Sequence, residues 1–147
     1  MLDLLNLDLN GHNALDLRCL AGRKGLSREL TVPDINRPGL ELTGFFEAFD
    51  ANRVQMFGRG EFAYVEKLYA EKNIVSIERL LSNHVPAVVF THDLRPRDEF
   101  LQLAEENVCP VLQTPLDSTE FSSRLIRIFS NIFAPKKPMH GVLLEVY

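Results

Sequence analysis

The sequence predicts an α/β fold in which a mostly parallel sheet carries helices on both faces. From residue 54 onward, short apolar segments rich in β-branched and aromatic residues alternate with longer segments of helical periodicity. Strands separated by helices pair in parallel through crossover connections, and these connections place the helices on the faces of the sheet. The 147 residues, 46% hydrophobic and 24% charged, fit a single domain with a sizeable core.

The first part of this alternation contains two predicted strands and two predicted helices. Residues 54–58 and 87–90 are apolar and favour β-structure, and Pro86 leads into the second of them. Residues 61–70 and 76–83 carry apolar side chains at helical spacing. These side chains are Phe62, Val65 and Tyr69 in the first helix, and Ile77, Leu80 and Leu81 in the second.

The second part continues as helix, strand and helix. Pro96 is expected at the first position of a helix, where its missing N–H group is harmless, and the acidic residues after it suit the positive end of the helix. Residues 108–112 form the next predicted strand. Asp117 and Glu120 have the spacing of a capping box and begin a helix that runs to about residue 133.

The helix over residues 117–133 has an apolar face wider than a helix covered on one side needs. Its stripe and the residues that widen it are Phe121, Leu125, Ile128, Ile132, Ile126, Phe129 and Phe133. We therefore expect this helix to pack against both the sheet and a partner subunit. Before residue 54 the pattern is less regular, and residues 14–20 and 29–32 are the candidate strands.

Residues 139–147 are an apolar, β-favouring run with one charge, Glu145. We expect a strand there and, because the run lacks a polar tail, a fragment of a longer protein. The alternative is an edge strand that closes a small domain.

Composition excludes several classes of partner. The net charge of −4 and the absence of long Lys/Arg runs argue against nucleic acid. No apolar run is long enough to span a bilayer, and the N-terminus lacks the basic region of a signal peptide, so we expect a cytoplasmic protein without a membrane partner. Cys19 and Cys109 are interpreted as buried thiols, with a disulfide or a catalytic cysteine as the alternative.

The most distinctive loop covers residues 36–44 and contains the signature residues Asn36, Arg37, Pro38, Gly39 and Glu41. Pro38 fixes φ and Gly39 permits a positive φ, so the pair predicts a tight turn. With Arg37 and Glu41 on either side, the turn could bind an anion or a partner. The other interpretation is that Arg37 hydrogen-bonds nearby carbonyl groups and holds the turn.

Two further segments lie where α/β folds place their sites. Gly58 and Gly60 follow a predicted strand and open a helix, but their spacing matches no phosphate-binding motif, which favours an ordinary strand-to-helix turn. His92 and Asp93 follow the strand over residues 87–90 and could lie at a ligand-binding edge. The alternative is a turn in which Asp93 acts as a local cap. No His, Cys or carboxylate pattern predicts a metal site.

Residues 36–46, 55–61, 86–91 and 139–147, in this order, resemble the N-terminal domain of bacterial HPr kinase/phosphorylase, and the resemblance runs from about residue 14 to the end. It implies a three-layer α/β/α fold similar to the N-terminal domains of Mur ligases. The family enzyme uses ATP to phosphorylate a serine of HPr, a small phosphocarrier protein, and removes that phosphate by phosphorolysis, which regulates carbohydrate metabolism through the phosphotransferase system. The resemblance also implies that the parent enzyme is a cytoplasmic hexamer.

The resemblance also divides the chain. Residues 1–134 would be the N-terminal domain, and residues 135–147 a linker and strand leading to the P-loop, which this chain does not contain. ATP and Mg²⁺ would bind to that absent domain, so we expect no cofactor here. His140 matches a family residue near the phosphate site and would act in catalysis only in the full-length enzyme; the alternative is a histidine that caps a strand. The expected role of the chain is regulation or scaffolding. The alternatives are a small-molecule-binding module, with its ligand near residues 91–95 or 114–117, and a self-association module using the helix over residues 117–133.

Overall fold

The computed structural model describes Leu4 and residues 14–28 and 30–133. The predicted strand over residues 139–147, the linker over residues 135–147 and the candidate residue His140 lie outside this part of the chain. No helix among the described residues is both long and apolar enough to cross a bilayer.

A five-stranded sheet forms the centre of the fold, in the order β1-β5-β4-β3-β2. The strands are β1 (Arg18–Ala21), β2 (Ile35–Asn36), β3 (Val54–Phe57), β4 (Val88–Phe90) and β5 (Val111–Gln113). The four strands from β2 to β5 pair in parallel, and β1 pairs with β5 in antiparallel orientation. The prediction of a mostly parallel sheet is confirmed.

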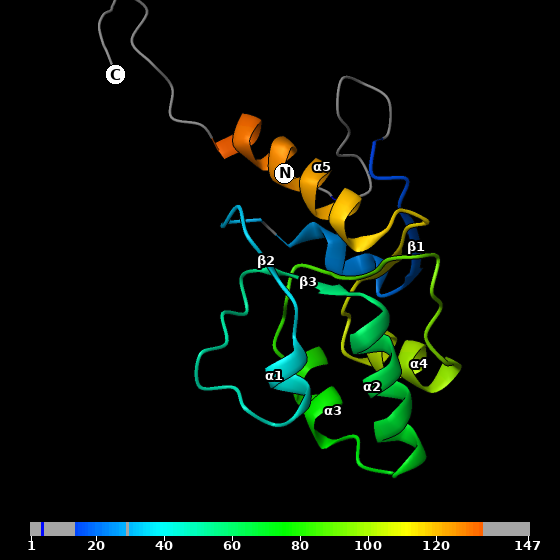
Figure 1. Cartoon of the computed structure of the whole chain (residues 1–147). Coiled ribbons are helices and arrows are strands. Elements are labelled where there is room, and N and C mark those ends of the chain that lie inside the picture. Colours follow the sequence, from blue (N-terminus) through cyan, green and yellow to red (C-terminus); the bar gives the residue numbers. More distant parts are fainter. Residues whose placement is uncertain (1–3, 5–13, 29, 134–147) are drawn as a thin grey trace, which may run out of the picture.

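Helices cover both faces of this sheet, so the fold has the predicted three layers (Figure 1). One layer consists of α1 (Gly39–Leu42), α2 (Arg59–Ala70), α3 (Val75–Leu81) and α4 (Asp98–Glu106). The other contains the 3₁₀ helix η2 (Arg23–Ser27) and α5 (Ser118–Phe133). In Figure 1, α1 to α4 lie below the sheet and α5 crosses above it.

Each face of the sheet has its own apolar core. Toward α1–α4, Phe57 and Phe90 pack with ring centroids 4.7 Å apart, and Phe100 of α4 meets Phe90 edge to face at 5.4 Å. Toward α5, the alternate strand residues Met56 and Val89 pack with the buried side of that helix. Side chains of successive strand residues point to opposite faces, which explains how the short, fully buried strands supply both cores.

Several predicted boundaries shift in the structure. Residues 30–32 form no strand, which contradicts the prediction for 29–32, and β2 follows at Ile35–Asn36. α4 begins at Asp98 with Arg97 as its N-cap, so Pro96 precedes the helix and does not open it. Arg97 has extended ψ (161°), which delays the helix by two residues. β5 begins at Val111 because Val108 adopts a positive φ (51°) in the turn after α4.

The helix α5 confirms its predicted start but only part of its predicted apolar face. Asp117 Oδ1 accepts a hydrogen bond from the Glu120 N–H group at 2.7 Å. The buried side chains are Phe121, Leu125, Ile128 and Phe129. Ile126 and Ile132, also part of the predicted face, are 52% and 37% exposed, so the predicted contact of this face with a partner subunit stays a prediction.

Candidate functional site

Polar side chains meet at the carboxyl ends of the parallel strands, and we call Arg37, Gly58, Glu61, Thr91 and Ser118 the strand-end cluster. Arg37 follows β2, Gly58 follows β3 and Thr91 follows β4, while Glu61 and Ser118 lie in the first turns of α2 and α5. The Thr91 and Ser118 hydroxyl oxygens share a hydrogen bond at 2.8 Å. A Cβ atom on Gly58 would lie 2.5 Å from Arg37 Nη2 and 2.7 Å from Ser118 Oγ. Only a glycine fits there without displacing its neighbours.

Arg37 and Glu61 form a two-pronged ion pair across the cluster. Arg37 Nε donates to Glu61 Oε2 at 3.1 Å, and Nη2 donates to Oε1 at 2.9 Å. The Gly58 N–H group donates to the same Oε1 at 2.8 Å. Burial alone would raise the pKa of Glu61, but the hydrogen bonds and charge of Arg37 and the Gly58 N–H group outweigh it and lower that pKa below its usual value. The interpretation that Arg37 binds carbonyl groups of its own turn is therefore wrong.

The loop over residues 36–44 folds differently from the predicted turn. Pro38 is the N-cap of the short helix α1, and Gly39 is the first helical residue. Gly44, at φ 104°, is the residue of this loop with a positive φ, so the expectation for Gly39 was wrong. Glu41 is buried and does not face Arg37, because its Oε1 accepts a hydrogen bond from Asn36 Nδ2 at 3.3 Å.

Asn36 ties this loop to the sheet. Its Nδ2 also donates to Gln55 Oε1 at 2.7 Å, and Gln55 Nε2 donates to the Arg53 carbonyl at 2.9 Å. Asn36 and Glu41 thus have structural partners inside the domain.

His92 and Asp93 form a turn in which both residues have positive φ values, 59° and 58°. His92 Nδ1 lies 3.0 Å from Thr91 Oγ1, which connects the ring to the strand-end cluster. Asp93 does not act as a local cap, because its Oδ1 accepts a hydrogen bond from Arg18 Nη2 of β1 at 2.6 Å. The prediction of a turn is confirmed and the predicted cap is wrong.

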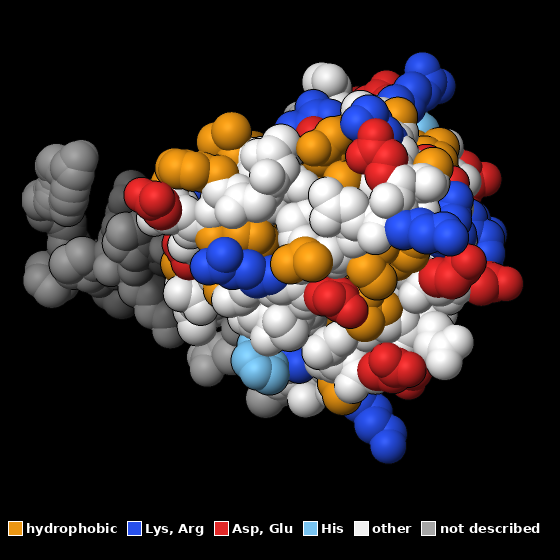
Figure 2. Space-filling view, turned by 90° about the horizontal axis from the view of Figure 1, so that it is seen from below, with side chains coloured by type: hydrophobic (Ala, Val, Ile, Leu, Met, Phe, Trp, Pro, Cys, Tyr) orange, Lys and Arg blue, Asp and Glu red, His pale blue; other side chains and the backbone are white. Residues whose placement is uncertain are grey.

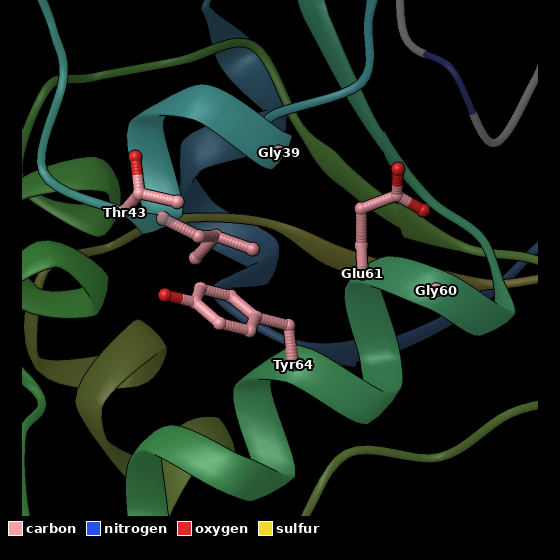
Figure 3. Close-up of a pocket in the computed structure, with 6 residues that line it drawn as sticks. Gly39, Thr43, Gly60, Glu61 and Tyr64 are labelled. Carbon is pink, nitrogen blue, oxygen red and sulfur yellow. The ribbon is translucent and has the colours of Figure 1, made fainter.

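A pocket opens beside the cluster, between α1 and α2 (Figure 3). It has a volume of about 220 Å³ and is lined by Gly39, Leu42, Thr43, Gly60, Glu61 and Tyr64. In Figure 3 the Tyr64 ring extends toward Thr43, while the Glu61 carboxylate stands at the other end. Sequence reasoning missed Thr43 and Tyr64 as lining residues. The available signal was the three-residue spacing of Glu61 and Tyr64, which places both on one side of α2.

Other side chains of the described residues bear on the chemistry that this part of the chain could perform. No group of three or more His, Cys, Asp or Glu side chains among them could hold a metal ion. Thr91 contacts a histidine, but the residue is completely buried and out of reach of a substrate. Cys109 is a free thiol whose burial raises its pKa to about 12, so it carries almost no thiolate at neutral pH.

Cys19 was expected to be buried but is partly exposed, and its Sγ lies 3.4 Å from the Ala21 carbonyl oxygen.

Comparisons with known proteins agree on one family. Residues 7–129 match the family described as HPr Serine kinase N terminus. HPr kinase/phosphorylase of Treponema pallidum (strain Nichols) is 48% identical over 144 residues, which cover 98% of this chain and 45% of the relative. The Bacillus subtilis (strain 168) enzyme of the same name is 33% identical over 132 residues, covering 90% of this chain and 43% of that protein.

A solved structure shares the fold. It contains the CBS and DRTGG domains of the regulatory region of Clostridium perfringens pyrophosphatase, complexed with the activator diadenosine tetraphosphate. The match has a TM-score of 0.54 at 17% identity and covers 79% of this chain and 44% of that one. The chain spans less than half the length of the curated relatives cited above. From the family match and these relatives, the chain belongs to the HPr serine kinase N-terminal family.

Proposed function

We propose that this chain is the N-terminal regulatory and scaffolding domain of a bifunctional HPr kinase/phosphorylase. The parent enzyme would phosphorylate a serine of HPr with ATP and Mg²⁺ and remove the phosphate by phosphorolysis, in the cytoplasm and in the control of carbohydrate metabolism. The activity proposed for the whole protein rests on the names of its relatives and on the family resemblance. This chain itself corresponds to less than half the length of those relatives.

One structural observation supports a non-catalytic role for this part. The carboxyl edge of the sheet, where α/β folds bind their ligands, is filled by the protein's own groups, with Arg37 held by Glu61 and Gly58 crowded by Arg37 and Ser118. A substrate phosphate would have to displace the Glu61 carboxylate from Arg37. This cluster therefore supports a structural role more than turnover.

The residues do not fit ATP either. Gly39 and Gly44 have the spacing of the two P-loop glycines, but Phe45 and Phe46 follow where that motif needs a lysine and a hydroxyl residue. Gly39 to Leu42 form a helix, so their backbone N–H groups do not form the open phosphate cradle of a P-loop. ATP and Mg²⁺ would then bind to the remainder of the parent protein.

The test compares the full-length protein with this chain. Each is incubated with HPr, ATP and Mg²⁺, and transfer to the HPr serine is measured by mass spectrometry. The full-length protein should phosphorylate HPr, and should release the phosphate when inorganic phosphate replaces ATP. The 147-residue chain should do neither. Turnover by the purified chain would contradict the proposal.

We further propose that the parent is a homo-oligomer, a hexamer by resemblance to the family. The observation that favours a contact through this domain is the exposure of Ile126 and Ile132 on α5. Replacing both by Asp should lower the solution mass of the full-length protein without unfolding it, measured by light scattering and circular dichroism. Phe129 is unsuitable for this test because it is buried. An unchanged mass would exclude a contact through Ile126 and Ile132.

A further inference from the structure

A second hollow adjoins the pocket of Figure 3, and together they form one groove along α1. The second hollow has a volume of about 180 Å³ and reaches α3, with Asn73, Ser76 and Arg79 among its lining residues. Both hollows share Leu42, Thr43 and Tyr64. The middle of the groove is therefore apolar and aromatic, and its two ends are polar. Figure 2 looks onto this helical layer, where hydrophobic side chains reach the surface among charged ones.

Two glycines keep the first hollow open although the fold does not require them. Gly39 and Gly60 occupy helical positions, and neither has a positive φ. A Cβ atom added to either would meet no atom within 4 Å. Glycine is a poorer helix former than alanine, although the penalty is smaller in the first turn than in a helix interior, so helix stability does not favour glycine at either position. The missing side chains leave room that another molecule can occupy.

The two ends of the groove differ in charge. At the α2 end, the Glu61 carboxylate is already neutralised by Arg37. At the α3 end, Arg79 lies with its guanidinium carbon 4.3 Å from the centre of the Phe46 ring. No carboxylate of a described residue lies within ion-pair distance of Arg79. The α2 end of the groove therefore carries no unpaired charge. The α3 end carries the positive charge of Arg79, which no carboxylate of the described residues neutralises.

Two further polar groups along the groove lack partners. Among the described residues, the Tyr64 hydroxyl and the Asn73 side-chain amide make no hydrogen bond. Both face a hollow, since Tyr64 lines each of the two and Asn73 lines the second. They could orient a bound molecule by one or two hydrogen bonds, as polar groups do in mostly apolar ligand pockets.

We propose that this groove binds a small organic anion, whose charged group pairs with Arg79 and whose apolar body lies over Leu42 and Tyr64 toward Gly60. A guanidinium binds a carboxylate or a phosphate through two parallel hydrogen bonds. The half-buried Tyr64 ring removes the apolar body of the ligand from water, and Leu42, which is 1% exposed, forms the floor beneath it. The proposed anion contact, Arg79, lies at the end of the groove away from Glu61 and the strand-end cluster, and the inference does not depend on the parent's catalytic activity.

The test titrates the ¹⁵N-labelled chain with three probes and follows amide shifts by NMR. The probes are 3-phenylpropionate, its neutral analogue 3-phenylpropanamide, and phenyl phosphate. We expect shifts at Thr43, Gly60 and Tyr64 with 3-phenylpropionate, at a dissociation constant on the order of 1 mM for so small a ligand. Phenyl phosphate, compared with the carboxylate, identifies the preferred anionic group. The amide should bind at least about tenfold more weakly.

Three variants make the result specific. Arg79→Gln should weaken binding of the carboxylate about tenfold and leave the neutral amide unchanged. Gly60→Leu should abolish both by filling the hollow. Arg127→Gln removes an exposed cation from α5, on the other face of the sheet, and should change nothing. Circular dichroism checks the fold of each variant, and Arg79→Gln still tests the site if Gly60→Leu fails to fold.

Three results would overturn the proposal: no localised shifts with either anion, equal binding of the amide and the carboxylate, or an unchanged affinity in Arg79→Gln. Because the titration contains neither HPr nor ATP, each of these results leaves the proposed function untouched. Conversely, an inactive full-length enzyme would not affect the groove.

Discussion

The strand-end cluster and the groove are neighbouring regions that share Glu61, yet one is closed and the other is open. In the cluster, Gly58 has no room for a methyl group, and every carboxylate oxygen of Glu61 has a donor. In the groove, Gly60 has empty space around it, and the Tyr64 hydroxyl has no hydrogen-bond partner among the described residues. Two glycines only two residues apart therefore serve opposite purposes. The usual ligand edge of an α/β sheet is filled here, and the available space lies between helices.

The largest expected effect comes from filling the closed region. Gly58→Ala should destabilise the protein by about 1–3 kcal/mol, because the new methyl group must displace Arg37 or Ser118. The matched control Gly60→Ala should leave the free energy of unfolding unchanged or raise it by about 0.5 kcal/mol. Urea denaturation of both variants measures the difference. Equal effects of the two substitutions would remove the distinction between the regions.

A smaller effect should follow from breaking the ion pair without changing its shape. Glu61→Gln should cost about 1 kcal/mol at neutral pH, a modest value because half of the Arg37 side chain is exposed. The pKa of Glu61 is lowered in the folded state, so its contribution is complete above its ordinary pKa of 4.5 and is lost as the pH falls through the lowered value.

The difference in unfolding free energy between the wild type and Glu61→Gln should therefore shrink on acidification below pH 4.5. Urea titrations at several pH values measure it. A difference that stays constant from pH 7 into strong acid would show that charge contributes nothing to this pair.

The smallest effect is expected in the open region. Tyr64→Phe removes a hydroxyl without a partner among the described residues, and should change the unfolding free energy by less than about 0.5 kcal/mol. Thr91→Val is the matched comparison in the cluster, where the lost hydroxyl contacts Ser118 and the Phe57 carbonyl, and should cost about 1–2 kcal/mol. Thermal unfolding of both variants distinguishes them. A larger loss in Tyr64→Phe would mean that this hydroxyl supports the fold.

The same contrast explains what could be predicted from sequence. The strands over residues 54–57 and 88–90 and the cap at Asp117 depend on local patterns, and the prediction located them. The partners of the site residues do not depend on local patterns. Arg37 reaches Glu61, 24 positions away, and Asp93 reaches Arg18, 75 positions away. Only the folded chain brings such residues together, so the sequence could place Arg37, Gly58 and Tyr64 on their elements but could not pair them across the cluster or around the groove.

The pairing of β1 constrains the order in which this domain can assemble. Within the described sheet β1 has one neighbour, β5, and Cys19 pairs with Leu112 in the antiparallel register. The parallel pairs β2–β3, β3–β4 and β4–β5 join strands that follow one another along the chain. Closing the long loop from β1 to β5 carries the larger entropic penalty, and contacts of this kind slow folding. During synthesis β1 emerges first of the five strands, yet it has nowhere to dock until β5 has been made.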